Sequence, residues 1–338
     1  MSTSTIDTER FSEEMRRRGV NRDTGTLRIT NFSGSEQEQD FTEPANCRGF
    51  GRVRHFRRET SDGWPRNPLP IDPAARALGV EPPPAMLEAQ VFQNAVCNWR
   101  CWYCFVDFDL LAGSPERSQM LSADELVALY RDDPRAPAMI DLTGGQPDLV
   151  PEWVPWMMEA LERAGLERSV YLWSDDNLSN DYFWRYLTEE ERSRLDGIEM
   201  YGKVCCFKGF DQHSFAFNTA AAPDLFERQL EFMGRLLAET TIDLYAYATF
   251  TTDRAERIGP GMADFVDRLQ ELDPQLPLRT VPLEITAFTP VVSRMREDRE
   301  RALALQQEAV AAWNSELGRR FSEAERGRSI CDVPLRRE

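Results

Sequence analysis

The chain has 338 residues, of which 41% are apolar and 29% charged, an ordinary balance for a soluble globular protein. Its formal net charge of −17 argues against broad binding to nucleic-acid phosphates, so a nucleic-acid partner is not expected. No stretch approaches the roughly 18 apolar residues of a membrane span, and the polar N-terminus lacks an apolar signal-peptide core. We therefore expect a cytoplasmic protein with no membrane partner.

Seven cysteines, an odd number, occur in a chain in which we see no secretory signal. This argues against a disulfide framework. A reducing compartment instead favours free thiols that can bind a metal.

The N-terminal quarter divides into two segments by composition. Residues 1–43 are polar and rich in Ser, Thr, Glu and Gln, and we expect them to be disordered. Residues 44–85 form an Arg- and Pro-rich extension, with seven prolines in 64–85 that favour an extended arm on a domain surface. The stretch Arg48 to Arg58, RGFGRVRHFRR, has five arginines and no acid. These arginines either bind a phosphate-bearing substrate or an acidic partner, or they pair with the protein's own carboxylates.

From residue 86 the patterns of strand and helix alternate. We expect strands at 87–96, 138–143, 169–174, 203–207, 243–251 and 281–288. We expect helices at 122–131, 151–164, 182–195, 223–239 and 261–272, with a C-terminal helical segment over 291–338. Such alternation implies a parallel sheet, and right-handed crossovers curl it toward a barrel. Because six units are fewer than eight, the predicted fold class is α/β, an open partial (β/α)6 TIM-like barrel over residues 86–290 with an N-terminal extension.

Polar residues gather where the predicted strands end, which is where parallel barrels carry their active sites. They are the cysteine loop after the first strand, Thr143 to Pro147, Ser174 to Asn177, Cys206 to Gly209, Tyr247, Thr249, Thr251, Glu284 and Thr286.

Cys97, Cys101 and Cys104 form a C-x3-C-x2-C pattern directly after the first strand, with Tyr103 before the last cysteine. Three thiolates in one loop can hold a metal centre and leave a coordination position free, whereas a [4Fe–4S] cluster normally takes four protein ligands. The alternative is a structural zinc site, which takes four ligands. Its fourth ligand would be one of Cys47, Cys205, Cys206 and Cys331.

This loop resembles the cluster loop of the radical S-adenosylmethionine (SAM) superfamily. In that family SAM chelates the open iron of a [4Fe–4S] cluster, and one electron splits SAM into methionine and a 5′-deoxyadenosyl radical that abstracts hydrogen from the substrate. The resemblance implies that Cys97, Cys101 and Cys104 bind such a cluster. It also implies SAM as a partner and a low-potential electron donor such as flavodoxin or ferredoxin.

The loop Gly144-Gly145-Gln146-Pro147 stands where the family has a Gly-Gly-Glu-Pro loop that binds the SAM amino group. Glycine lets backbone approach a ligand closely. Gln146 departs from the family pattern, since its amide oxygen accepts a hydrogen bond but carries no charge.

The resemblance also implies that Tyr103 and Asp176 bind the cofactor. Asp175, Asp176 and Asn177 lie where the family often has a polar pair near the ribose or methionine part of SAM. Asp175, Asp176 and Asn177 have an alternative role as a helix N-terminus.

Lys208 is expected to hold the SAM carboxylate; the alternative is a surface lysine. The stretch from Lys208 to Gln229 resembles the activating-enzyme-like branch, in which an Asp-x-Lys pattern is common, but here Cys206 replaces the acid. Strand alternation puts Cys206 on the inner face with Lys208 and turns Cys205 toward the helices. Cys206 is then either a buried residue without a role in the chemistry, a hydrogen-atom donor or a ligand.

The resemblance predicts a radical SAM enzyme acting on a small molecule. One alternative is an activase that abstracts hydrogen from a partner protein, which needs an open mouth; an N-terminal arm across the mouth would favour the small molecule. The other alternative is a non-enzymatic zinc protein.

Overall fold

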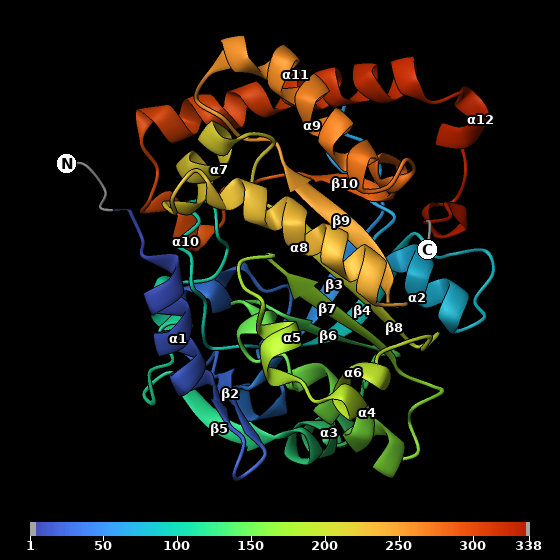
Figure 1. The fold of residues 1–338 in the computed structure, drawn as a ribbon. Coiled ribbons are helices and arrows are strands. Elements are labelled where there is room, and N and C mark those ends of the chain that lie inside the picture. The colour runs from blue at the N-terminus through green and yellow to red at the C-terminus, as the bar shows by residue number, and fades with distance from the viewer. Residues whose placement is uncertain (1–4, 336–338) are drawn as a thin grey trace.

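The computed structural model describes residues 5–335, and one curled sheet of seven strands organises them (Figure 1). In spatial order the strands are β3 (Gly51–Arg57), β4 (Met86–Gln93), β6 (Met139–Thr143), β7 (Tyr171–Asp176), β8 (Tyr201–Phe207), β9 (Asp243–Thr249) and β10 (Thr280–Leu283). From β4 to β10 neighbours run parallel and in chain order, whereas β3 pairs antiparallel with β4. The sheet is a half-barrel, with β3 and β10 as its edges.

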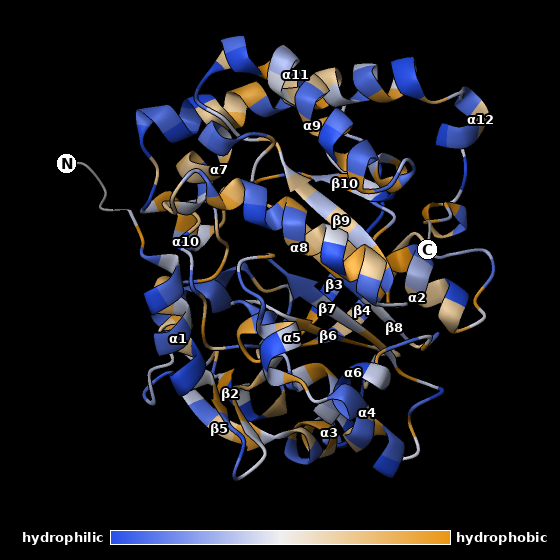
Figure 2. Cartoon of the chain, viewed as in Figure 1, coloured by the Kyte–Doolittle hydropathy of each residue, from blue (hydrophilic) through white to orange (hydrophobic). Residues whose placement is uncertain are grey.

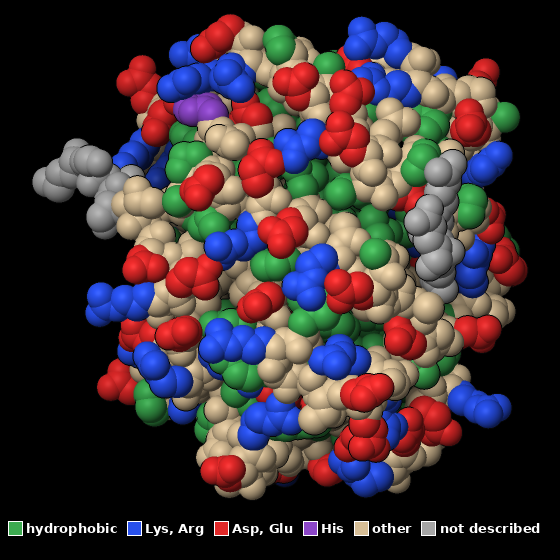
Figure 3. Space-filling model, in the orientation of Figure 1, with side chains coloured by type: hydrophobic (Ala, Val, Ile, Leu, Met, Phe, Trp, Pro, Cys, Tyr) green, Lys and Arg blue, Asp and Glu red, His purple; other side chains and the backbone are tan. Residues whose placement is uncertain are grey.

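Helices cover the outer face of this sheet (Figure 1). From residue 123 on, the helices are α3 (Ala123–Asp132), α4 (Trp153–Arg163), α5 (Tyr182–Tyr186), α6 (Glu189–Ser193), α7 (Gln212–Thr219), α8 (Leu225–Glu239), α9 (Ile258–Leu272), α10 (Thr289–Val292), α11 (Glu297–Arg320) and α12 (Glu323–Arg326). Of these, α10 lies instead at the open side, beside the 3₁₀ helix Glu36–Asp40. Figure 2 shows polar and apolar residues alternating along α8 and α9, as expected for helices with one face on a core. Figure 3 shows acidic and basic side chains interspersed over the outer surface. No helix within residues 5–335 is long and apolar enough to cross a membrane.

Four of the predicted elements differ from the structure by three residues or more. The strand expected at 87–96 ends at Gln93, and the helix expected at 261–272 begins at residue 258. The helix expected at 182–195 is two short helices, because Thr188 caps α6 through a capping box with Glu191 and the chain is extended at Leu187. The last strand ends at Leu283 rather than at residue 288, so Glu284 and Thr286 follow the strand.

Side-chain alternation divides the core into two layers. On β8, Cys205 and Phe207 pack outward in the layer under the helices, whereas Val204 and Cys206 pack inward with the aromatic lining of the half-barrel. The predicted orientations of the two neighbouring cysteines are confirmed.

The expectation of disorder over residues 1–43 is wrong for residues 5–43; residues 1–4 lie outside the described part. This segment forms α1 (Thr8–Gly19), β1 (Val20–Asn21) and β2 (Thr26–Thr30). Together with β5 (Ser118–Ser122), β1 and β2 make a three-stranded antiparallel sheet. Of the few apolar residues of the segment, Met15, Leu27, Ile29 and Phe32 are buried, and Phe11, Val20 and Phe41 are partly buried against the core. Their small number made the composition look disordered, yet each has a partner surface.

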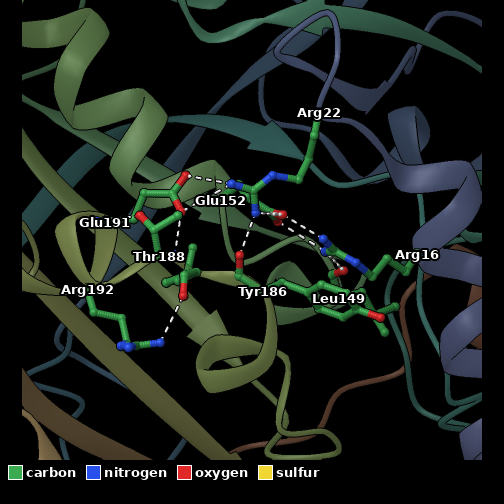
Figure 4. Close-up of polar contacts among 9 residues, drawn as sticks. Arg16, Arg22, Leu149, Glu152, Tyr186, Thr188, Glu191 and Arg192 are labelled. Carbon is green, nitrogen blue, oxygen red and sulfur yellow. Dashed lines mark hydrogen bonds and ion pairs between the residues drawn. The ribbon is translucent and has the colours of Figure 1, made fainter.

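A buried charge cluster ties α1 to the half-barrel (Figure 4). The Arg16 guanidinium donates to both carboxylate oxygens of Glu152, at 2.5 and 3.0 Å, and to the carbonyl of Leu149 at 2.9 Å. Arg22 reaches the same carboxylate at 2.9 Å. The Glu152 side chain has no exposed surface, so this carboxylate depends on the two arginines for its stability.

The extension at 44–85 is part of the fold rather than only an arm on its surface. Its arginine-rich stretch supplies β3, which pairs with β4 over seven residues. The following segment crosses toward the opposite edge, where the Trp64 indole donates to the carbonyl of Pro282 at 3.1 Å. It then forms α2 (Ile71–Ala77). Arg52 and Arg54 alternate with Val53, so this basic stretch keeps the two-residue period of a strand.

Candidate functional site

A cavity of about 460 Å³ opens at the carboxyl ends of the parallel strands, inside the curl of the sheet. Its size is typical of small-molecule sites. Residues that sequence analysis selected line it: Cys97, Cys101, Tyr103, Cys104, Gly144, Gly145, Asp175, Asn177, Cys206, Lys208, Tyr247, Glu284 and Thr286. They come from the carboxyl-terminal parts of different strands and from the loops that follow them, as the parallel arrangement dictates.

The three cysteines lie in an irregular loop between β4 and the short 3₁₀ helix Phe108–Leu111. Cys97 packs in an apolar cluster with Phe32 and Leu110, and Cys104 lies against the same cluster. Arg294, which follows α10, donates from its guanidinium to the carbonyls of Cys104 at 2.7 Å and Val106 at 2.9 Å. Sequence analysis missed Arg294, because nothing local links it to a loop about 190 residues earlier.

Aromatic side chains of the same loop anchor it to the rest of the fold. The Trp99 indole donates to Thr8 on α1 at 3.1 Å, and the Trp102 indole donates to Asn218 on α7 at 3.0 Å. The Tyr103 hydroxyl lies 3.1 Å from the Thr249 hydroxyl at the end of β9. Tyr103 therefore lines the cavity and also fixes the loop to the sheet.

Burial keeps the thiols of Cys101 and Cys104 neutral in the protein by itself. Burial raises the pKa of Cys101 to about 12, although the nearby Lys208 ammonium acts in the opposite direction. Burial, together with Cys97, also raises the pKa of Cys104. Thiolate formation here needs a metal, which deprotonates a coordinating thiol.

The residues fit an iron–sulfur cluster by the chemistry of the donor set, since soft thiolates in an apolar setting are its usual ligands. Within residues 5–335, no three His, Cys, Asp or Glu side chains converge closely enough to hold a single metal ion. Of the four cysteines considered as a fourth zinc ligand, Cys206 lines the cavity, whereas Cys47, Cys205 and Cys331 do not. Burial raises the pKa of Cys206 to about 12, so its thiol is also neutral.

The two glycines join the cysteine loop to the end of β6. Both have a positive φ, 75° at Gly144 and 63° at Gly145. A Cβ at Gly145 would lie 2.4 Å from the carbonyl oxygen of Val96, directly before the first cysteine of the triad. The backbone N–H of Gln146 donates to the same carbonyl at 2.8 Å. The glycine loop and the cysteine loop are thus held together as one unit.

Gln146, Pro147 and Asp176 are not in the cavity wall. The Gln146 side chain donates to Asp176 at 2.7 Å, and its amide oxygen accepts from the backbone N–H of Asn177 at 2.9 Å. The oxygen that was expected to meet a ligand amine thus already has a partner. A direct cofactor contact by these three residues stays a prediction; here they connect the loops after β6 and β7.

Asp175, rather than Asp176, lines the cavity. The Thr143 hydroxyl donates to its carboxylate, and burial raises its pKa. Lys208 also lines the cavity, and within residues 5–335 its ammonium makes no hydrogen bond and no ion pair. An unpaired ammonium at a cavity wall is available to an anionic ligand.

Two arginines that sequence analysis placed in the extension also line the cavity, Arg52 and Arg54 on β3. Between them and Asp175 lies Asp141, in the middle of β6, with no exposed surface and no hydrogen bond to either oxygen. An acid in the middle of the apolar strand MIDLT was the available signal for this residue. For the arginines the signal was their spacing of two residues, which puts both on one face of a strand.

The open side of the half-barrel is bridged by the N-terminal region. The 3₁₀ helix Glu36–Asp40 is held at the end of β4, where Gln37 donates to Gln93 at 3.1 Å. On the other side Asp40 accepts from the hydroxyl of Thr289, the first residue of α10, at 2.8 Å. These two contacts link the end of β4 to α10, which follows β10, and Gln37 and Asp40 line the cavity.

No protein-family model matches the chain, and no curated protein matches it. Part of the chain is similar to solved structures of SuiB from Streptococcus suis. For SuiB bound to S-adenosylmethionine, the identity is 15% and the TM-score 0.35, over 52% of this chain and 36% of that chain. For SuiB bound to precursor peptide SuiA, the values are 14% and 0.36, over 53% and 36%. The matched region thus spans about a third of SuiB. TM-scores of this size assign neither activity nor substrate.

Proposed function

We propose that the chain is a radical SAM enzyme built on an open (β/α)6 half-barrel, with a [4Fe–4S] cluster bound by Cys97, Cys101 and Cys104. The observation that carries the proposal is that all three cysteines line one cavity together with the glycine loop and Lys208. When bound, the cluster would supply the electron that splits SAM into methionine and a 5′-deoxyadenosyl radical, which abstracts hydrogen from the substrate.

In this proposal the chain's own residues bind and orient. The backbone of Gly144 and Gly145 gives a close approach to the SAM amino group. The unpaired ammonium of Lys208 binds the SAM carboxylate. Arg294 and Tyr103 hold the cysteine loop in place through the contacts described above. A low-potential donor of the flavodoxin or ferredoxin type is the proposed electron source.

The proposed substrate is a small molecule. The bridge between Gln93 and Thr289 across the open side supports this choice, because a partner-protein loop would have to displace it. The cavity volume of about 460 Å³ also suits a small molecule beside the cofactor.

The proposal is tested by anaerobic reconstitution with iron and sulfide, followed by dithionite and SAM. We expect an EPR signal of the reduced cluster that changes with SAM, and formation of 5′-deoxyadenosine. Replacing any one of Cys97, Cys101 and Cys104 with Ala should abolish cleavage, whereas Cys47→Ala, outside the cavity wall, should not. A colourless protein that binds zinc and leaves SAM intact would favour the structural zinc site.

A further inference from the structure

Arg52 is a buried cation that has neither an acid nor a hydrogen-bond acceptor as its partner within residues 5–335. It is 9% exposed and lines the cavity from β3. Within residues 5–335 its guanidinium makes no ion pair and no hydrogen bond, and its Nε is buried without an acceptor. The rings of Phe41 and Phe105 lie 5.0 and 5.6 Å from its Cζ. Because burying a charge is costly unless it is paired, this side chain lacks the partner that its position requires.

A second guanidinium lies on the same face of the strand, two residues further along. Arg54 lines the cavity, and its nearest acid, Asp141, is 3.7 Å away, longer than a hydrogen bond. Burial, with the charge of Asp175 adding to it, raises the pKa of Asp141 to about 8. This carboxyl therefore offsets the two guanidiniums only in part near neutral pH.

Several other charges near this wall have partners, whereas the exposed Arg57 of β3 adds a further positive charge to the lining. Arg58, from the same basic stretch, pairs with Asp72 at 2.5 Å, so the alternative of internal pairing holds for that arginine. Among the acids of the cavity wall, Asp40 accepts from Thr289, and Glu284 accepts from the backbone of Ser61. The unpaired charge on the β3 side is thus positive, in a chain whose net charge is −17.

We propose that Arg52 and Arg54 bind an oxyanion group of the substrate, a carboxylate or a phosphate. Alternate residues of a strand are about 7 Å apart, so the two side chains can flank one such group. Guanidinium is the side chain best suited to binding it through two parallel hydrogen bonds. That the bound anion belongs to a substrate rests on the proposed function, whereas the presence of an anion site does not.

The site is separate from the one proposed for the SAM carboxylate. Lys208 follows β8, and three strands, β4, β6 and β7, lie between β8 and β3 in the sheet. The two cation sites therefore occupy different walls of the cavity, and each takes its own anionic group.

Direct binding of simple anions tests the proposal. The full chain, before reconstitution, is titrated calorimetrically with inorganic phosphate and separately with acetate, at an ionic strength held constant with chloride. We expect one of the two to bind, which identifies the group. Arg52→Gln should weaken that binding by about tenfold or more, as expected for losing charged hydrogen bonds. Arg48→Gln, an exposed arginine of the same stretch that does not line the cavity, should leave it unchanged.

Thermal unfolding separates this role from a structural one. Removing an uncompensated buried cation should leave the melting temperature of Arg52→Gln equal to or above that of the parent chain without added anion. A lower melting temperature would indicate a structural arginine and overturn the proposal.

Three further results would also overturn the proposal. The first is that neither anion binds the parent chain with a Kd below about 10 mM. The second is that Arg48→Gln weakens anion binding as much as Arg52→Gln does, and the third is a tenfold loss of SAM affinity in reconstituted Arg52→Gln. Failure of the parent chain to cleave SAM would instead sink the proposed function and leave the anion result standing.

Discussion

Replacing Glu152 with Ala should destabilise the fold strongly, although this residue lies outside the cavity wall. The Glu152 side chain has no exposed surface and Arg16 has 9%, so the change leaves a nearly buried guanidinium whose one remaining hydrogen-bond acceptor among the described residues is the Leu149 carbonyl, beside the Tyr186 ring. Breaking a buried pair in this way costs about 3–5 kcal/mol. Arg22 is 39% exposed, so its share adds only about 0–1 kcal/mol.

Equilibrium urea unfolding followed by circular dichroism measures this loss. The matched control is Glu14→Ala on the same helix, whose pair with Arg18 is 39% and 46% exposed. It should cost less than about 1 kcal/mol. A double variant, Arg16→Met with Glu152→Leu, should recover most of the stability, because apolar residues can replace a buried pair. A Glu152→Ala variant no less stable than the control would refute the reasoning.

Three further predictions concern the cavity. Lys208→Met should raise the Kd for SAM about tenfold or more while the cluster absorbance is unchanged; equal affinity would remove its proposed role. Arg294→Gln deletes two hydrogen bonds to the cysteine loop, so iron should pass to a chelator faster than from the parent chain, and equal rates would contradict this. The pKa of Asp141 is raised to about 8 in the folded protein, whereas it is about 4 in the unfolded chain. The folded state therefore favours the protonated carboxyl, and the stability that this gives at low pH is lost as the pH rises from about 4 through 8. Asp141→Asn should therefore gain melting temperature relative to the parent chain between pH 5 and pH 9, and a constant difference would show that Asp141 does not titrate in this range.

Local patterns in the sequence determined the framework and much of the site. Alternation with a period of two and the succession of strands and helices located the six parallel strands and oriented Cys205 and Cys206 correctly. Because the ends of parallel strands meet at one edge, the same reasoning selected the cysteines, the glycine pair and Lys208, all of which line the cavity.

Tertiary structure alone decided the contacts between distant segments. The order of residues 5–43 depends on surfaces far along the chain, such as Glu152 for Arg16 and Trp99 for Thr8. Composition cannot reveal these contacts, since it records how much apolar surface a segment has and not what covers it.

The same limit applies to charge. The sequence showed five arginines in one stretch, but not that Arg58 would meet Asp72 while Arg52 would be buried without an acid. Whether a charge is paired, and how far burial shifts its pKa, is set by neighbours in space, and those neighbours come from strands and loops that are brought together only when the sheet curls.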